Sequence, residues 1–147
     1  MRVSEILPRK PTDVVYVEPS ATMRVAIGLM KHHHIGSVLV LEAGARLRGV
    51  LSERDIVHAF VSDPVNLRDR PVIDFARNDG PTATPDDTVQ SVMELMTATR
   101  ARHVPIIQYG RVVGIVSIGD VVKSCLNEKI QENAVLQEIA RAQYFAN

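Results

Sequence analysis

Apolar and polar residues follow one another along this chain in an order that occurs twice. In each copy a short β-branched run precedes a stretch with helical spacing of apolar residues. Two apolar runs joined by a glycine-containing turn come next, and a second helical stretch follows. Runs of Val and Ile between turn residues are typical of strands, and apolar residues three and four apart are typical of helices. The pattern therefore predicts two units, each with the order strand, helix, strand, strand, helix.

The first unit is expected to begin with a strand at 14–17. A helix follows, and Ser20 or Thr22 can cap it because a side-chain oxygen accepts a hydrogen bond from a free backbone amide. This helix is expected to fray into the polar run 31–34, with Gly36 as the break. The rest of the unit is predicted as two strands and a helix capped by Ser52, at 37–41, 47–51 and 53–59.

The second unit repeats this order with a weaker first strand, expected at 82–84, and a helix that Thr88 caps. Its paired strands are predicted at 104–107 and 111–116, with the turn at Tyr109 and the following glycine. Methionines occupy matched helical positions in the two units, so all four are predicted to lie in the core: Met23, Met30, Met93 and Met96.

Three segments lie outside the repeat. A short helix is expected at 3–7, and another near 72–76 in a polar, proline-containing stretch. The last helix is predicted to run from Asp120 to about Arg141, past the end of the second unit. The chain is thus divided into a lead-in at 1–13, units at 14–61 and 80–129, a linker at 62–79 and a helical extension at 130–147.

The last helix carries an irregular apolar stripe that its own unit cannot cover completely. Val122, Leu126 and Ile130 belong to it, followed by Leu136 or Ile139. A helix that continues past its domain with such a stripe typically packs against another helix. We therefore expect a homodimer.

Composition narrows the class of protein. The 147 residues are 46% apolar, and 17 basic side chains balance 17 acidic ones. This balance, with three Phe, three Tyr and no Trp, weighs against nucleic-acid binding. No apolar stretch approaches the ~20 residues that a membrane span needs, and the charged start lacks the apolar core of a signal peptide. A cytoplasmic protein with no membrane contact is expected.

Reactive side chains give little support for catalysis. Cys125 is the single cysteine, so an internal disulfide is excluded and a packing role on a helix is favoured. The run His32-His33-His34 points in different directions around a helix, which favours a frayed helix end over a metal site. No Ser-His-Asp or Cys-His arrangement and no Gly-rich phosphate loop is recognisable. The sequence therefore indicates a protein that is not an enzyme.

One polar motif is kept in both copies. The run from Gly49 through Ser52 to Asp55 returns from Gly114, with Gly, two aliphatic residues, Ser, two variable residues and Asp. A Ser with an acidic residue three positions later is typical of a plain helix cap, and a single copy would favour that interpretation. An Asp held ionised at a helix start can also accept two hydrogen bonds from a ribose diol, and nearby amides can bind phosphate.

This order of elements, ending in Gly-aliphatic-aliphatic-Ser-x-x-Asp, resembles the CBS domain, and the tandem pair resembles a Bateman module. The resemblance covers about residues 1–129 and looks like the stand-alone bacterial type. It implies an α+β (mixed α/β) fold of two β-α-β-β-α units packed by pseudo-two-fold symmetry through their sheets. It also implies a homodimeric disc of four units that passes the ligand state to an unidentified protein effector.

Similar modules bind adenosine-containing regulatory ligands in two clefts: AMP, ADP, ATP, NAD(H) or S-adenosylmethionine. The resemblance implies no catalytic cofactor and no metal. It assigns the ribose hydroxyls to the Asp of each motif, places the Ser near ribose or phosphate, and builds the adenine position partly from the opposite unit. One cleft then comprises Ser52, Asp55, Gly80, Pro81, Arg102, His103 and Val104. The other comprises Ser117, Asp120, Val14, Val15, Ile35, Gly36 and Ser37.

The two clefts are not expected to be equal. Arg102 and His103 stand where the first unit has Gly36 and Ser37, so the Asp55 cleft is expected to hold phosphate better. Two further cations are candidate phosphate contacts or plain surface charges, Arg54 and Lys123. The competing hypothesis is a ligand-free scaffold with vestigial clefts, in which the long last helix recruits a partner.

Overall fold

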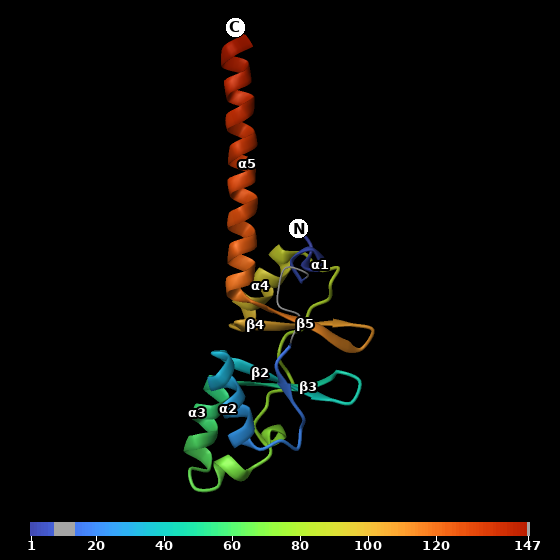
Figure 1. Cartoon of the computed structure of the whole chain (residues 1–147), viewed down its shortest axis with the longest axis vertical. Coiled ribbons are helices and arrows are strands. Elements are labelled where there is room, and N and C mark those ends of the chain that lie inside the picture. Colours follow the sequence, from blue (N-terminus) through green and yellow to red (C-terminus); the bar gives the residue numbers. More distant parts are fainter. Residues whose placement is uncertain (8–13, 147) are drawn as a thin grey trace.

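Two small sheets face each other at the centre of the molecule, and each carries its helices on its outer side (Figure 1). The computed structural model describes residues 1–7 and 14–146. The fold is a mixed α/β arrangement of two units related by pseudo-two-fold symmetry, as expected, with a long helix leaving one end.

The first unit follows the predicted order, and its elements are β1 (Tyr16–Val17), α2 (Met23–His33), β2 (Ser37–Glu42), β3 (Arg46–Ser52) and α3 (Glu53–Ser62). Thr22 rather than Ser20 caps α2, because its Oγ1 accepts from the amide of Val25 at 3.4 Å. The helix ends at His33, three residues before Gly36, and His34 adopts the left-handed conformation with φ 53°. The turn that ends the helix therefore falls on His34 and not on Gly36.

The second unit contains α4 (Val89–Thr99), β4 (His103–Gln108), β5 (Arg111–Ser117) and α5 (Ile118–Ala146). Thr88 caps α4, since its Oγ1 accepts from the amide of Ser91 at 3.0 Å. The weak strand expected at 82–84 is reduced to a parallel bridge between Ala83 and Ile106.

The strand pairing makes the two units equivalent. β1 pairs parallel to β2, and β2 pairs antiparallel to β3 from Ser37 opposite Ser52. β4 and β5 pair in the same way from His103 opposite Ser117. In both hairpins the register shifts at the corresponding place, after Val40 in the first and after Ile106 in the second. The repeat in the sequence is thus a repeat of register as well as of element order.

The segment before each unit packs against the other unit. The N-terminal helix α1 (Val3–Ile6) buries Val3 and Ile6 in the core of the second unit, and Arg2 pairs with Thr88. The linker, with the 3-10 helices η2 (Leu67–Asp69) and η3 (Val72–Asp74), packs on the first unit instead. There Pro71 pairs with Thr22, as Arg2 does with Thr88. The linker is therefore part of the first core and not a free connection.

Burial confirms most of the predicted core. Met23, Met30 and Met96 are buried, and Cys125 is a free thiol packed against the core of the second unit. Met93 is the exception, because 37% of it is exposed on α4. Its assignment to the core was wrong.

The helix α5 is longer than predicted. It buries Val121 and Ser124 against the second unit, and its later residues extend away from the rest of the molecule (Figure 1). Its exposed apolar side chains include Val122, Leu126 and Ile130. No helix among the described residues is long and apolar enough to cross a membrane.

Candidate functional site

The first Ser-x-x-Asp motif lies where β3 ends and α3 begins. Oδ2 of Asp55 accepts hydrogen bonds from the backbone amide and the hydroxyl of Ser52, both at 2.8 Å. The Ser52 Oγ in turn accepts from the amide of Asp55 at 3.3 Å. These reciprocal bonds form a capping box, which fixes the carboxylate at the positive end of the helix.

Asp55 is nearly buried, with 8% of the residue exposed. Within the described residues its hydrogen bonds reach Oδ2 and none reaches Oδ1. No fully buried side-chain oxygen or nitrogen in that part of the chain lacks a partner. Oδ1 must therefore remain accessible at the surface, where it can accept hydrogen bonds from a bound molecule.

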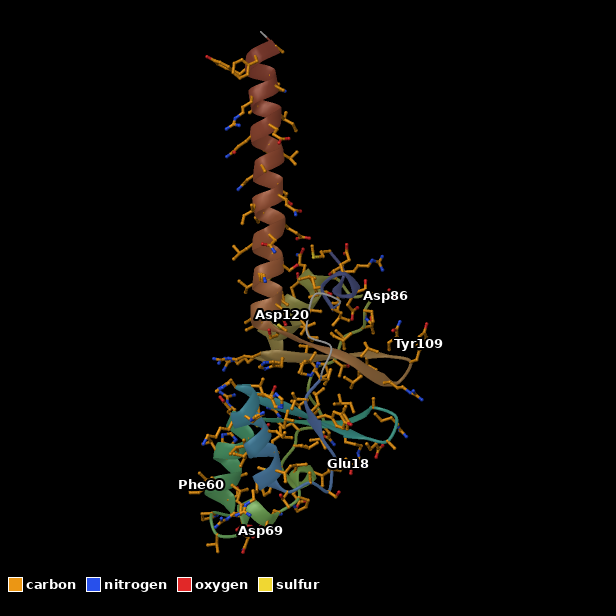
Figure 2. All side chains as sticks on the ribbon, in the orientation of Figure 1. Glu18, Phe60, Asp69, Asp86, Tyr109 and Asp120 are labelled. Atoms are coloured by element: carbon orange, nitrogen blue, oxygen red, sulfur yellow. The ribbon has the colours of Figure 1, made fainter. Side chains whose placement is uncertain are left out.

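The second motif has the same geometry at the base of α5, where Figure 2 labels Asp120. Oδ2 of Asp120 accepts from the amide of Ser117 at 2.7 Å and from its hydroxyl at 2.8 Å. The Ser117 Oγ accepts from the amide of Asp120 at 3.2 Å. Asp120 has a further interaction, whereas within the described residues the hydrogen bonds of the Asp55 carboxylate all reach Oδ2.

The segments predicted to form the adenine positions lie beside the motif of their own unit. The carbonyl of Gly36 accepts from the amide of Glu53 at 3.0 Å, and Ser37 is the register partner of Ser52.

In the second unit the carbonyl of Arg102 accepts from the amide of Ile118 at 2.8 Å, and His103 is the register partner of Ser117. The predicted reach of these segments across to the opposite unit stays a prediction.

Most apolar residues of the predicted clefts pack against the two cores. Val104 is fully buried in the core of the second unit. Val15 and Ile35 pack against the first core, and the carbonyl of Val15 accepts from the amide of Leu39 at 3.4 Å. Val14 is half-buried just before β1. These residues can shape a cleft wall, but their side chains offer no polar recognition.

A hollow of about 420 Å³ opens beside Asp55, between α3 and the end of the linker. This volume is within the ≈ 300–1,000 Å³ of small-molecule sites. Phe60, which Figure 2 labels, lies on the exposed outer face of α3 and does not line this hollow. The lining residues are Arg54, Asp55, His58, Ala59, Ser62, Asp74, Phe75 and Arg77.

Ion pairs organise the linker side of this hollow. Arg70 contacts Asp74 at 3.0 Å and Asp63 at 3.3 Å, and its guanidinium lies 4.7 Å from the centre of the Phe75 ring. The hydrogen bond to Asp74, followed by that to Asp63, raises the pKa of Arg70 above its usual value. The negative charge of Asp74 is therefore compensated before any ligand arrives.

A second, smaller hollow of about 90 Å³ lies where the linker joins the second unit. Gly80 and Pro81, predicted for the Asp55 cleft, line this space together with Arg48 and Arg77. Arg77 borders both hollows. Arg54 lines the larger hollow with Asp55, and Lys123 is exposed on α5; the phosphate contacts expected of both stay predictions.

Several lining residues were not predicted from the sequence. His58 and Ser62 stand one and two turns after Arg54 on α3, a spacing that could have indicated a shared face. Phe75 and Arg77 come from the linker and carried no such signal. Among the described residues no group of three or more His, Cys, Asp or Glu could hold a metal ion.

Comparison with known proteins identifies the repeat. A family model described as CBS domain matches twice, over residues 3–62 and 70–127. The CBS domain-containing protein YhcV of Bacillus subtilis is 30% identical over 134 residues, covering 90% of this chain and 91% of YhcV.

Solved structures share the fold. A CBS-domain-containing protein from Agrobacterium tumefaciens has a TM-score of 0.78 at 36% identity, covering 84% of this chain and 98% of that chain. CBSX2, solved in complex with AMP, has a TM-score of 0.75 at 20% identity, covering 87% and 98%.

Proposed function

The chain belongs to the CBS-domain family, and on that premise we propose that it is a regulatory module that binds an adenosine-containing ligand and passes the bound state to a protein partner. The candidate ligands are AMP, ADP, ATP, NAD(H) and S-adenosylmethionine. The AMP complex of CBSX2, which has the same fold, supports an adenine nucleotide. The role is regulatory and not catalytic.

The observation that carries this proposal is the state of the Asp55 carboxylate. One oxygen is committed to the helix cap, and the other is accessible beside a hollow. The cap holds the carboxylate in place, so little freedom is lost when a ligand binds. An ionised carboxylate accepts hydrogen bonds only, which suits the two hydroxyl donors of a ribose diol.

The second motif extends the proposal to the Asp120 cleft. Gly36 and Ser37 with the strand before them would contribute to that cleft, while Arg102 and His103 would contribute to the Asp55 cleft. Because the second pair brings donors for phosphate and the first does not, the two sites would differ in affinity. Arg102→Gln should then weaken a phosphorylated ligand at the Asp55 site and leave the Asp120 site unchanged.

Isothermal titration of Asp55→Asn tests the proposal. Asparagine keeps an oxygen for the amide and hydroxyl of Ser52, so the cap persists. The free energy of unfolding should fall by about 1 kcal/mol at most. It removes the anionic acceptor, which should weaken ligand binding by about tenfold or more. Asp120→Asn is the matched variant in the other unit. If no candidate ligand binds the wild type below millimolar concentration, the sensing function is refuted.

A scaffold role is the second candidate, because both capping boxes are complete without a ligand. On this view Ser52 and Asp55 serve only to start α3. Asp55→Asn would then leave every titration unchanged, and its small loss of stability would be its only effect.

Homodimerisation accompanies either function in our proposal. The exposed side chains of Val122, Leu126 and Ile130 follow one another at four-residue spacing along α5. Such a stripe on one helix buries apolar surface when it meets a second copy. A dimer would also give a partner protein a composite surface whose shape depends on the ligand.

A further inference from the structure

The hollow beside Asp55 follows α3 from its first turn to its last. Arg54, His58 and Ser62 are spaced four residues apart, so they share one face of the helix. Eight residues of α-helix extend about 12 Å. Three polar side chains therefore line an elongated groove that begins at the ribose-binding carboxylate.

Two arginines and two aspartates line this groove, and its donors are less engaged than its acceptors. Within residues 1–7 and 14–146, the side chains of Arg54 and His58 have no hydrogen-bond or ion-pair partner. Arg77 contacts Asp79 at 3.5 Å, but the two side chains are 59% and 74% exposed. An ion pair so exposed contributes little to stability. Its guanidinium is thus available to a stronger acceptor.

Of the two acidic residues of the groove, Asp74 is engaged by Arg70, and Asp55 has one of its two oxygens engaged. Asp74 is compensated by Arg70, which contacts it at 3.0 Å. Asp55 holds its carboxylate at the positive end of α3 with two hydrogen bonds to one oxygen. The donors of Arg54, His58 and Arg77 are what remains for a ligand, and together they favour an extended anion.

We infer that this groove binds the phosphate chain of a nucleoside di- or triphosphate whose ribose is held by Asp55. The inference rests on the proposed function and narrows it from adenosine-containing ligands in general to polyphosphates at this site. Arg54, in the first turn of α3, contacts the phosphate nearest the ribose. His58 contacts the phosphates farther along, and Arg77 contributes a positive charge from the linker side of the groove.

The spacing of the donors excludes the other ligand classes as the best fit. A single phosphate can reach the donors at the start of α3 but leaves those a turn or more farther along unused. The sulfonium of S-adenosylmethionine adds a positive charge to a groove that already holds two arginines. A chain of two or three phosphates satisfies the whole row.

Titration calorimetry with ATP, ADP, AMP and S-adenosylmethionine tests the inference on the full-length chain. We expect ATP or ADP to bind at least tenfold more tightly than AMP. His58→Ala should weaken ATP about five- to tenfold and change AMP by less than twofold, because His58 stands one turn beyond Arg54 on α3. Arg77→Gln provides a second variant and should weaken ATP as well. Its fold should persist, since the backbone amide and carbonyl of Arg77 make the two bonds to Val50.

Arg46→Gln is the matched control. It removes the same charge at the start of β3, six residues and therefore about 20 Å along the strand from Ser52, and should leave ATP binding unchanged. If ATP and AMP bind equally, or if Arg77→Gln and His58→Ala have no effect while Asp55→Asn abolishes binding, the polyphosphate inference is wrong and the sensing function survives. If none of the four ligands binds, both fail.

Discussion

Replacing Gly49 by alanine measures how closely the linker approaches the first unit. A β-carbon at Gly49 would lie 3.0 Å from Cβ of Ala76 and 3.1 Å from the carbonyl oxygen of Arg77. Carbon atoms in favourable contact are separated by about 3.5–4.0 Å. The linker would therefore have to move by several tenths of an ångström or more.

That movement is opposed by the pairing of the linker with β3. The amide of Val50 donates to the carbonyl of Arg77 at 2.9 Å, and the amide of Arg77 donates back at 3.0 Å. Overpacking of this kind costs about 1–3 kcal/mol. Alanine regains about 0.4–1 kcal/mol because it restricts the unfolded chain. We expect Gly49→Ala to lower the free energy of unfolding by about 1–2 kcal/mol.

Gly114, the equivalent residue of the second unit, provides the internal comparison. Its added β-carbon would meet Cδ2 of Leu7 at 2.8 Å, with the Leu7 Cγ at 3.9 Å as the only other near atom. A leucine end can rotate away, whereas a backbone carbonyl cannot. Gly114→Ala should therefore change stability by less than about 1 kcal/mol.

Urea denaturation followed by circular dichroism measures both variants, with an unchanged slope as the check on two-state unfolding. The double variant Gly49→Ala with Ala76→Gly relieves the Cβ contact and should recover part of the loss, but the carbonyl contact stays. Equal costs at Gly49 and Gly114, or no cost at Gly49, would refute this account. Because Gly49→Ala displaces Arg77, it should also weaken ATP binding.

Two further predictions concern the core and the assembly. In the same denaturation assay, Met96→Ala should lower the free energy of unfolding by about 2–5 kcal/mol and Met93→Ala by less than about 1 kcal/mol, because only Met96 is buried. Similar losses of stability would show that Met93 is covered in solution. Ile130→Lys should shift the protein from dimer to monomer in light scattering, whereas Asn127→Lys, an exposed polar position on α5, should leave the dimer intact; a wild type that is monomeric at all concentrations contradicts the proposed homodimer.

Local patterns were enough to predict the order of elements. Helix caps are read from neighbours, and Thr22, Ser52 and Thr88 all accept the expected amide bonds. The helix end at His34 was missed because Gly36 carried the usual signal for a break, while the left-handed turn fell on a less common residue. Met93 has helical spacing, but spacing alone does not give the width of the buried face.

The exchange of the segments before each unit could not be predicted from periodicity. Val3 precedes the first unit in the sequence but is fully buried in the core of the second unit. Val72 precedes the second unit but is fully buried in the core of the first. Tertiary packing decides which unit an apolar segment covers, and the pattern of neighbouring residues in the sequence does not reveal it. The same limit applies to the hollow beside Asp55, because Phe75 and Arg77 reach α3 through the pairing of the linker with the first unit, which includes the bonds to Val50 and Ala21.

The differences between the two motifs lie in the positions that the repeat leaves variable. Ser and Asp are kept because both helices need the same cap, and their hydrogen bonds agree within 0.1 Å in the two copies. The residue before the Asp is Arg54 in one unit and Gly119 in the other. In the proposed function a cation at that place would serve a phosphate, and it contributes nothing to the cap. Identical frames would then present different ligand chemistry, and a nucleotide that distinguishes the two sites would bias the packing of the units through its differential affinity.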